Sequence, residues 1–429
     1  MKVNLYKKIY FFVTICFSYC AHAQWTVLAR IESASNYMSL AVDKNNVPFV
    51  LYNDGNSFTT VKKYENNTWK SVGARGFSNN YVFSPVLAIS NNDSVYTAFS
   101  EWGDGYPQQI SVMKFNGTAW VYVGNRFITP GASNFVSLAT DSSNAPFIAF
   151  QDESDLNKLS VMKFNGKAWE YVGRRSFSPR NASYVSLAFD KLNKPYVAFR
   201  DSSNKASVMK FDGADWSVVG AFGFSAGNIY YKTSLAFDNN NIPYVAYTDV
   251  ANGNKATVMK FDGIHWINAG PPGFSPTVAF DIQIAIDSSD AAYVGYKNNQ
   301  FDGKATVMKL GNNTWSVVGA EAFTPYVFAN HSLALNKYGT PYVATDSGSV
   351  TVMKYVNPPY RFIGNGDWNN AANWSNNVIP PNPLPGDNSI IIDPQGECIL
   401  NDTITLSEGA NLTVTPGKKF TVKGNVLVH

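Results

Sequence analysis

Acidic side chains recur at one position of this 429-residue chain, each directly after a short apolar run that reads as a strand. Carboxylates gathered on one face could accept hydrogen bonds from sugar hydroxyls or bind a cation. The simpler alternative is that they cap their own loops and form exposed ion pairs with nearby lysines, which contribute little. The acids are Asp54, Glu101, Asp152, Asp201, Asp249 and Asp346, with Asn298 at the seventh position. The lysines are Lys158, Lys205, Lys255 and Lys304.

The segment 101–106 differs from the rest of the chain, because Trp102 and Tyr106 match nothing at the corresponding positions elsewhere. Exposed aromatic rings beside Glu101 and Asp104 suit stacking on a sugar ring, with hydrogen bonds from its hydroxyls to the carboxylates. Alternatively, Trp102 folds back and covers its own loop. Weaker candidates for ligand binding are Tyr184 and Tyr231, which enter the first strands of the fourth and fifth units, and Arg200 and His331, which appear once each at their positions.

The chain shows few signs of catalysis. Its histidines after the N-terminal leader lie far apart, and no pair has the spacing of metal ligands. No serine stands in a nucleophile-elbow motif. We therefore predict no catalytic residue, no metal and no cofactor, although the abundant carboxylates leave open a hydrolase or lyase that acts on polysaccharides. The histidines are His265, His331 and His429.

An internal repeat carries these residues. A Leu-Ala pair, once Ile-Ala, returns every 47 to 51 residues and opens the same four short β-type runs. Residues 186–220 show them clearly as Ser-Leu-Ala, Pro-Tyr-Val-Ala-Phe, Ser-Val-Met-Lys-Phe and Trp-Ser-Val-Val-Gly, separated by turn-forming Asn, Asp, Gly and Pro. Four strands in about 40 to 50 residues are typical of a propeller blade, and a closed ring of blades buries both faces of each sheet. We therefore predict an all-β, seven-bladed propeller. The pairs begin at Leu40, Leu87, Leu138, Leu187, Leu235, Ile284 and Leu333.

Alternating strand directions predict two unlike faces for this ring. The lower face would collect the uniform turns between first and second strands, and the upper face would collect the variable loops, where binding function is usually carried. A lysine closes each third strand, and we expect its stem to pack between blades and its amine to meet acids of the lower turns, such as Asp190 or Asp238. These lysines are Lys63, Lys114, Lys163, Lys210, Lys260, Lys309 and Lys354.

The seventh unit stops before its fourth strand. A tryptophan opens that strand in the six other units, whereas the seventh runs from Tyr355 into a proline pair. The missing strand stands at the other end of the chain, as the segment 25–29, Trp-Thr-Val-Leu-Ala. We therefore predict that it completes the seventh blade. Closing a loop of roughly 330 residues costs on the order of 5 kcal/mol, which burial of one tryptophan can offset. The six tryptophans are Trp69, Trp120, Trp169, Trp216, Trp266 and Trp315.

Residues 1–23 have the pattern of a signal peptide: three lysines, an apolar run that ends at Cys20, and the small-x-small sequence 21–23. The apolar run is too short to span a membrane. We expect cleavage after Ala23 and a secreted or cell-surface protein. A lipid anchor on Cys20 is the rival interpretation, but Tyr19 is bulky for the residue that precedes a lipidated cysteine.

Cleavage would lower the formal net charge from +3 to 0, because the leader carries three lysines and no acid. A neutral chain argues against nucleic acid as a partner. Cys398 would be the one remaining cysteine, which leaves no internal disulfide and no cysteine metal cluster. An exported protein without disulfides is typical of bacteria, and we expect a monomer with no transmembrane segment in the mature chain.

Residues 359–429 form a second predicted region, after a propeller of residues 24–358. Proline-rich stretches mark linkers, and two tryptophan motifs within 366–374 are expected to form a small cap. The strands that follow resemble the opening turns of a right-handed β-helix on bacterial surface proteins. Families with this layout often end in a sorting domain, which we do not see before His429, so a truncated chain with an exposed β edge is an open alternative. The predicted strands are 389–393, 397–400, 403–406, 411–415 and 419–422.

The units around 205–213, Lys-Ala-Ser-Val-Met-Lys-Phe-Asp-Gly, resemble the repeats of secreted bacterial β-propeller proteins. The resemblance spans about residues 25–355 and implies the fold but no activity. Sialidase-type propellers differ, because they use an arginine cluster, whereas the arginines here are scattered. We therefore expect a non-catalytic binding or adhesion propeller that recognises glycans or surface polymers. The alternatives are a polysaccharide-acting glycoside hydrolase or lyase, and a structural scaffold or spacer.

Overall fold

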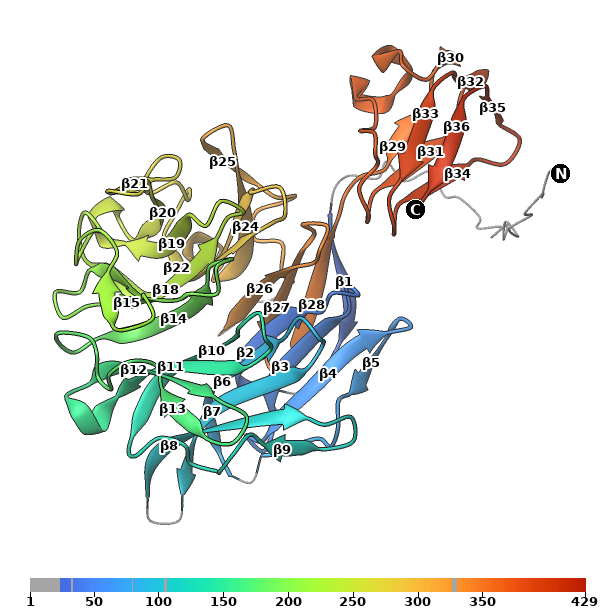
Figure 1. The fold of residues 1–429 in the computed structure, drawn as a ribbon. Coiled ribbons are helices and arrows are strands. Elements are labelled where there is room, and N and C mark those ends of the chain that lie inside the picture. The colour runs from blue at the N-terminus through green and yellow to red at the C-terminus, as the bar shows by residue number, and fades with distance from the viewer. Residues whose placement is uncertain (1–23, 32–33, 79, 104–105, 326–329) are drawn as a thin grey trace. The chain divides into compact units, whose positions relative to one another are not determined.

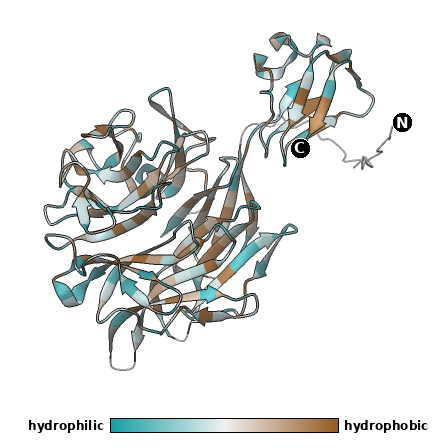
Figure 2. Cartoon of the chain, in the orientation of Figure 1, coloured by the Kyte–Doolittle hydropathy of each residue, from teal (hydrophilic) through white to brown (hydrophobic). Residues whose placement is uncertain are grey.

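The computed structural model describes residues 24–31, 34–78, 80–103, 106–325 and 330–429. The chain divides into two compact units, one of residues Gln24–Val356 and one that contains Asn357–His429. Figure 1 shows that β-strands dominate both units, and Figure 2 shows hydrophobic residues on the strands and hydrophilic ones in many of the turns.

Seven four-stranded antiparallel sheets make up the described part of the first unit, which confirms the predicted seven-bladed propeller. Blades 1 to 6 follow chain order, and blade 7 contains β26 to β28 (His331–Leu335, Pro341–Asp346 and Val350–Val356) with β1 (Gln24–Arg30). The strands of blades 1 to 6 are β2–β5 (Ala34–Val42, Pro48–Asp54, Thr59–Glu65, Thr68–Ser71), β6–β9 (Val82–Ile89, Val95–Gly103, Tyr106–Phe115, Trp120–Tyr122), β10–β13 (Ser133–Thr140, Pro146–Asp152, Lys158–Phe164, Trp169–Tyr171), β14–β17 (Ser183–Phe189, Pro195–Arg200, Ala206–Phe211, Trp216–Val218), β18–β21 (Ile229–Phe237, Pro243–Asp249, Lys255–Phe261, Trp266–Asn268) and β22–β25 (Ala279–Ile286, Ala292–Asn298, Lys304–Gly311, Thr314–Val317).

The hydrophobic core of the propeller lies between blades rather than within them. Each of its clusters of buried side chains joins two neighbouring sheets, as where Val245 of blade 5 packs with Val208 of blade 4. The last interface joins blade 7 to blade 1, through residues such as Val352 and Val50. Each sheet therefore depends on its two neighbours to bury its apolar faces.

The recurring sequence Trp-x-x-Val-Gly is explained by contacts between consecutive blades. The indole of Trp266 in blade 5 donates a hydrogen bond to the carbonyl oxygen of Val219 in blade 4, with an N···O distance of 2.8 Å. Gly220 follows with a φ of +71°, and a Cβ there would lie 3.1 Å from Cδ1 of Trp266. A side chain at this position would meet both backbone strain and the neighbouring indole, so glycine is required.

The N-terminal strand closes the ring, as predicted. Strand β1 pairs antiparallel with β28, with Trp25 opposite Tyr355. Trp25 is buried, donates from Nε1 to the carbonyl oxygen of Val318 at 2.9 Å, and stacks on Phe323 with ring centroids 3.9 Å apart. Figure 1 shows blue β1 beside the orange-brown β28.

The lysines at the ends of the third strands stack more than they pair. The ammonium of Lys114 lies over the ring of Tyr96 at 5.3 Å, and that of Lys309 lies over Tyr293 at 4.8 Å. Lys309 also reaches a lower-turn acid, because its Nζ lies 3.9 Å from Oδ2 of Asp287. The expected ion pairs to Asp190 and Asp238 are not found among the described residues, where Oδ1 of each carboxylate accepts hydrogen bonds from backbone N–H groups of its own turn.

The C-terminal unit is built from short parallel strands that stack in three sheets. In three of the five pairings the partners lie 22 residues apart, as Ile390 and Leu412 do. In the two earlier pairings the separation is 30 residues, from Tyr360 to Ile390, and 32 residues, from Gly366 to Cys398. Trp368 and Trp374 are buried in its core, and burial raises the pKa of the Cys398 thiol to about 12. Whether this unit belongs to the β-helices of surface proteins stays a prediction. Its strands are β29 (Tyr360–Phe362), β30 (Gly366–Asp367), β31 (Ser389–Ile392), β32 (Glu397–Leu400), β33 (Thr403–Leu406), β34 (Asn411–Val414), β35 (Lys419–Val422) and β36 (Asn425–Val428).

Helical structure in the described ranges is confined to single 3-10 turns, and none of it is long and apolar enough to cross a membrane. These turns are η1 (Glu153–Asp155), η2 (Val250–Asn252), η3 (Asn299–Phe301), η4 (Ala371–Asn373) and η5 (Ser375–Asn377).

The closure predicts a large effect of Trp25 on stability. Trp25→Ala should lower the free energy of unfolding of the mature chain by about 3–5 kcal/mol, because it leaves a cavity against Phe323 and removes the indole donor. Trp25→Phe keeps a ring in the stack and should cost about 1–2 kcal/mol. Chemical denaturation followed by circular dichroism measures both values. Equal stability of Trp25→Ala and the unaltered chain would contradict closure by this strand.

Candidate functional site

Most of the acids at the ends of the second strands are buried and hold their own loops. Oδ1 of Asp249 accepts a hydrogen bond from the backbone N–H of Ala251 at 3.1 Å, and Oδ2 accepts one from Thr257 Oγ1 at 2.9 Å. Asp54 likewise accepts from the N–H groups of Asn56 and Phe58. Their recurrence therefore has a structural explanation in loop capping.

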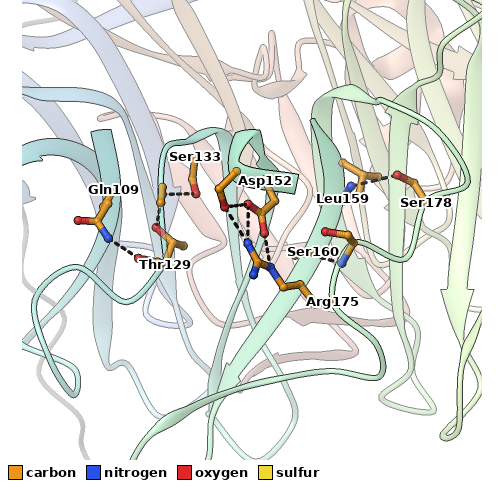
Figure 3. A network of polar contacts seen from close by, with 11 residues as sticks. Gln109, Thr129, Ser133, Asp152, Leu159, Ser160, Arg175 and Ser178 are labelled. Carbon is orange, nitrogen blue, oxygen red and sulfur yellow. Dashed lines mark hydrogen bonds and ion pairs between the residues drawn. The ribbon is translucent and has the colours of Figure 1, made fainter. Parts of the chain in front are cut away.

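Arginines neutralise two of these acids. Glu101 and Asp152 are fully buried, and each receives two hydrogen bonds from one guanidinium, that of Arg126 or Arg175. Figure 3 shows Arg175 pointing at Asp152. Arg75 forms a similar pair, because its Nε lies 3.5 Å from Oδ2 of Asp54. All three arginines stand two residues after the glycine that ends a blade. These three arginines pair with acids of three different blades and form no sialidase-type cluster, but their recurrence at one offset from that glycine is a signal that sequence reasoning missed.

Asp201 has a different neighbour, because Phe222 stands where those blades have arginine. Its carboxylate accepts hydrogen bonds from Ser203 and Ser207. It also lines a cavity of about 220 Å³ together with Phe222 and Arg180.

In the loop at 101–106 the described aromatic ring is that of Trp102, and it is exposed. Trp102 is 51% exposed and contacts Phe83 edge-on, with ring centroids 6.4 Å apart. Glu101 faces Arg126 instead of the loop surface. Asp104 and the side chain of Tyr106 lie outside the described residues, so the predicted pairing of rings and carboxylates in this loop stays a prediction.

The inner strands gather a different set of residues around the axis. In blades 1 to 6 each inner strand carries a β-bulge with a residue at positive φ. A bulge of this kind re-aims side chains locally. The residues at positive φ are Tyr37, Ser84, Phe135, Tyr184, Tyr231 and Asp281.

Two cavities lie at these bulges, and we call them together the axial site. The axial cavity, of about 400 Å³, is lined by residues from all seven inner strands, among them Phe135, Tyr184 and His331. The side cavity, of about 350 Å³, shares Tyr184 and Lys232 with it and adds Tyr231 and Asp281.

Aromatic rings form a continuous arc along the axial site, from blade 3 to blade 6. Tyr184 lies 4.5 Å from Phe135 and 5.7 Å from Tyr231, measured between ring centroids. Tyr230 lies 4.0 Å from Tyr231 and 5.4 Å from Phe280. We call Phe135, Tyr184, Tyr231, Tyr230 and Phe280 the aromatic arc. Tyr231 is 46% exposed and Tyr230 is 38% exposed, so part of the arc is open to a ligand.

Asp281 organises the polar side of the axial site. Its carboxylate pairs with the ammonium of Lys232, and its Oδ2 lies 3.2 Å from Nδ1 of the buried His331. Burial alone would raise the pKa of Asp281, but the charge of Lys232 and the hydrogen bonds from His331 and Lys232 outweigh it. The pKa of Asp281 therefore lies well below its ordinary value, and the group is ionised.

Two tyrosines of the arc, Tyr184 and Tyr230, have a raised pKa and are held in the protonated form. Burial raises the pKa of Tyr184, although the nearby Arg200 opposes this. The pKa of Tyr230 is raised by its hydrogen bond to Tyr231, in which the two hydroxyl oxygens are 3.0 Å apart. Both side chains therefore serve as neutral hydrogen-bonding groups with an apolar ring face.

The structure thus brings together the candidates that the sequence ranked lower. Tyr184, Tyr231 and His331 line the axial site, and the guanidinium of Arg200 lies 5.5 Å from the ring of Tyr184. Sequence reasoning missed Phe135, Tyr230, Phe280, Lys232 and Asp281. The available signal was that all five residues stand three to five positions before the Leu-Ala or Ile-Ala pair.

No family model and no curated protein matches this sequence. Among solved structures, a lectin from Burkholderia pseudomallei is 14% identical, with a TM-score of 0.55 over 76% of this chain and 97% of that chain. An ulvan lyase, a polysaccharide lyase, is 9% identical, with a TM-score of 0.51 over 77% of this chain and 94% of that chain. The same lyase has also been solved with a bound saccharide, at a TM-score of 0.50. At these identities the similarity shows a shared fold.

The cluster around Asp281 predicts a pH-dependent contribution to stability. Because its folded-state pKa is depressed, the contribution is present above the unfolded-state pKa of about 3.9 and is lost as the pH falls toward the folded-state value. Asp281→Asn should therefore be less stable at pH 7, by about 3 kcal/mol, and the difference should shrink below about pH 4. Thermal melts from pH 7 to acid measure this. The control Asp302→Asn, at an exposed loop position, should track the unaltered chain; a pH-independent deficit of Asp281→Asn would contradict the assignment.

Proposed function

We propose that the propeller is a non-catalytic glycan-binding domain that holds a saccharide at the axial site. The aromatic arc beside the Lys232–Asp281 pair is the observation that carries this proposal. Sugar rings have an apolar face and a rim of hydroxyls, so they suit tyrosines that offer both a ring and a hydroxyl. Cavities of about 400 and 350 Å³ are of a size that accommodates small ligands.

Several features favour binding over catalysis. A glycoside hydrolase needs two carboxylates flanking the scissile bond, whereas Asp281 is the one carboxylate among the residues described as lining the axial site. Its depressed pKa is the opposite of what a general acid requires. A raised pKa makes Tyr184 a poor base for a lyase reaction. Glu101 and Asp152 are already engaged by arginines.

One of the solved structures with a related fold is a lectin. Its existence supports the idea that this architecture can be used to bind saccharides. The leader in residues 1–23 supports export. We therefore place the mature chain, cleaved after Ala23, outside the cell or on its surface, as a monomer whose partner is a glycan or surface polymer. Adhesion to such a polymer would follow from this binding. A polysaccharide-acting enzyme remains the alternative that the test below distinguishes.

The test is a glycan-array screen of the purified mature chain, followed by calorimetry with the best saccharide. Tyr184→Ala and Tyr231→Ala should each weaken binding roughly tenfold or more, because each removes a stacking face. Tyr81→Ala is the matched control, since Tyr81 is 62% exposed and lines neither cavity of the axial site. Melting temperatures of all variants establish that they are folded.

Two other outcomes would contradict the proposal. Loss of binding in Trp102→Ala, with Tyr184→Ala and Tyr231→Ala unaffected, would move the site to the loop at 101–106. Release of reducing or unsaturated sugar that stops in Asp152→Asn or Asp201→Asn would show a polysaccharide-acting enzyme.

A further inference from the structure

The residue that precedes the acid at the end of each second strand has a structural task in several blades. In blade 1, Nδ2 of Asn53 donates to the carbonyl oxygen of Val82, at the start of the next inner strand, at 3.0 Å. Ser100, Gln151 and Thr248 make the corresponding hydrogen bonds to the blades that follow theirs. A small or neutral polar side chain suffices for this link. The residues at this position are Asn53, Ser100, Gln151, Arg200, Thr248, Lys297 and Thr345.

Blades 4 and 6 replace this neutral residue with a cation. Two nitrogens of the Arg200 guanidinium donate hydrogen bonds to Oδ1 of Asn204, at 2.6 and 3.1 Å. This amide oxygen is an uncharged acceptor. Its guanidinium also lies over the ring of Tyr184. Lys297 lines the side cavity with Tyr230 and Tyr231. The two cations therefore stand on the blades on either side of blade 5, which supplies the two exposed tyrosines of the arc.

The charged side chains described at the axial site, namely Lys232, Asp281 and Lys297 in its lining and Arg200 beside Tyr184, sum to a positive charge, whereas the chain after the expected cleavage is formally neutral. Lys232 is balanced by Asp281 through their ion pair. Arg200, beside Tyr184, and Lys297, in the side cavity, add two positive charges. Both cations can donate hydrogen bonds to neutral hydroxyls, but a negatively charged ligand would gain Coulomb attraction in addition, so their positions favour an acidic ligand over a neutral one.

We infer that the ligand of the axial site is an acidic glycan, in which sugar rings stack on Tyr184 and Tyr231 while acidic groups meet Arg200 and Lys297. This inference rests on the proposed function and adds the chemical class of the saccharide. Carboxylates and sulfate esters share the chemistry that a guanidinium recognises, namely oxygens that accept paired hydrogen bonds. Because the cations stand two blades apart, an oligomer or polymer with repeated acidic groups fits better than a single sugar.

The experiment compares three polysaccharides of known charge with the full mature chain: alginate for carboxylates, dextran sulfate for sulfate esters and dextran as the neutral reference. Biolayer interferometry at about 50 and 500 mM NaCl separates the electrostatic part of the affinity, because screening at the higher salt is stronger. The variants are Arg200→Thr and Lys297→Thr, singly and together, since Thr248 and Thr345 show that the fold accepts threonine here. Lys167→Gln, at an exposed lower turn, is the charge-matched control.

We expect tighter binding to at least one acidic polymer than to dextran, and roughly a tenfold loss in the double variant with no loss in Lys167→Gln. A preference for alginate or for dextran sulfate identifies the acidic group. If a neutral glycan binds through Tyr184 and Tyr231 and the double variant binds it equally well, the acidic class is wrong and the proposed function stands. If the tyrosine variants leave every affinity unchanged, the proposed function fails, and this inference fails with it.

Discussion

The hydrogen bond from each indole to a carbonyl oxygen of the preceding blade is the interaction on which the ring depends. Among the described residues, the indole of Trp120 donates to the carbonyl oxygen of Val72, and the same contact recurs between later blades. Trp25 donates to Val318 and Trp69 donates to Ala29, and these two contacts complete the ring. A sheet that is apolar on both faces is stable only between two neighbours. The two core clusters that flank blade 7 are therefore complete only when β1 joins that blade, because they include Trp25 and Leu28.

A second set of hydrogen bonds fixes the inner strands. Ser186 Oγ accepts from the backbone N–H of Leu235 in the next blade at 3.0 Å, and Ser332 accepts in the same way from Leu40 across the closure. These hydrogen bonds fix each inner strand at the residues that follow the bulge. The bulge residue itself can therefore vary without loss of the fold. Residues as different as Ser84, Tyr184 and Asp281 occupy that position, which explains how one repeated blade can build an asymmetric site.

The carboxylates that follow the second strands and the carboxylate at the axial site have different tasks. The acids after the second strands satisfy buried loop amides or arginines, as Asp249 and Asp152 do, and an unpaired charge at such depth would be costly. Asp281 stands instead beside the aromatic arc, where it orients Lys232 and His331. The site therefore combines a neutral stacking surface, an internally balanced ion pair and two further cations.

The sequence by itself determined the blade count, the strand content and the closure, because each follows from a repeated local pattern and from one blade that lacked its tryptophan. It also marked Tyr184, Arg200, Tyr231 and His331 as departures from the repeat. Only the tertiary structure decided that these residues meet, since the ring brings bulges about 50 residues apart around one axis. Only the structure showed that Glu101 and Asp152 face inward. Their direction depends on hydrogen bonds from Arg126 and Arg175, which a later loop of the same blade places beside them.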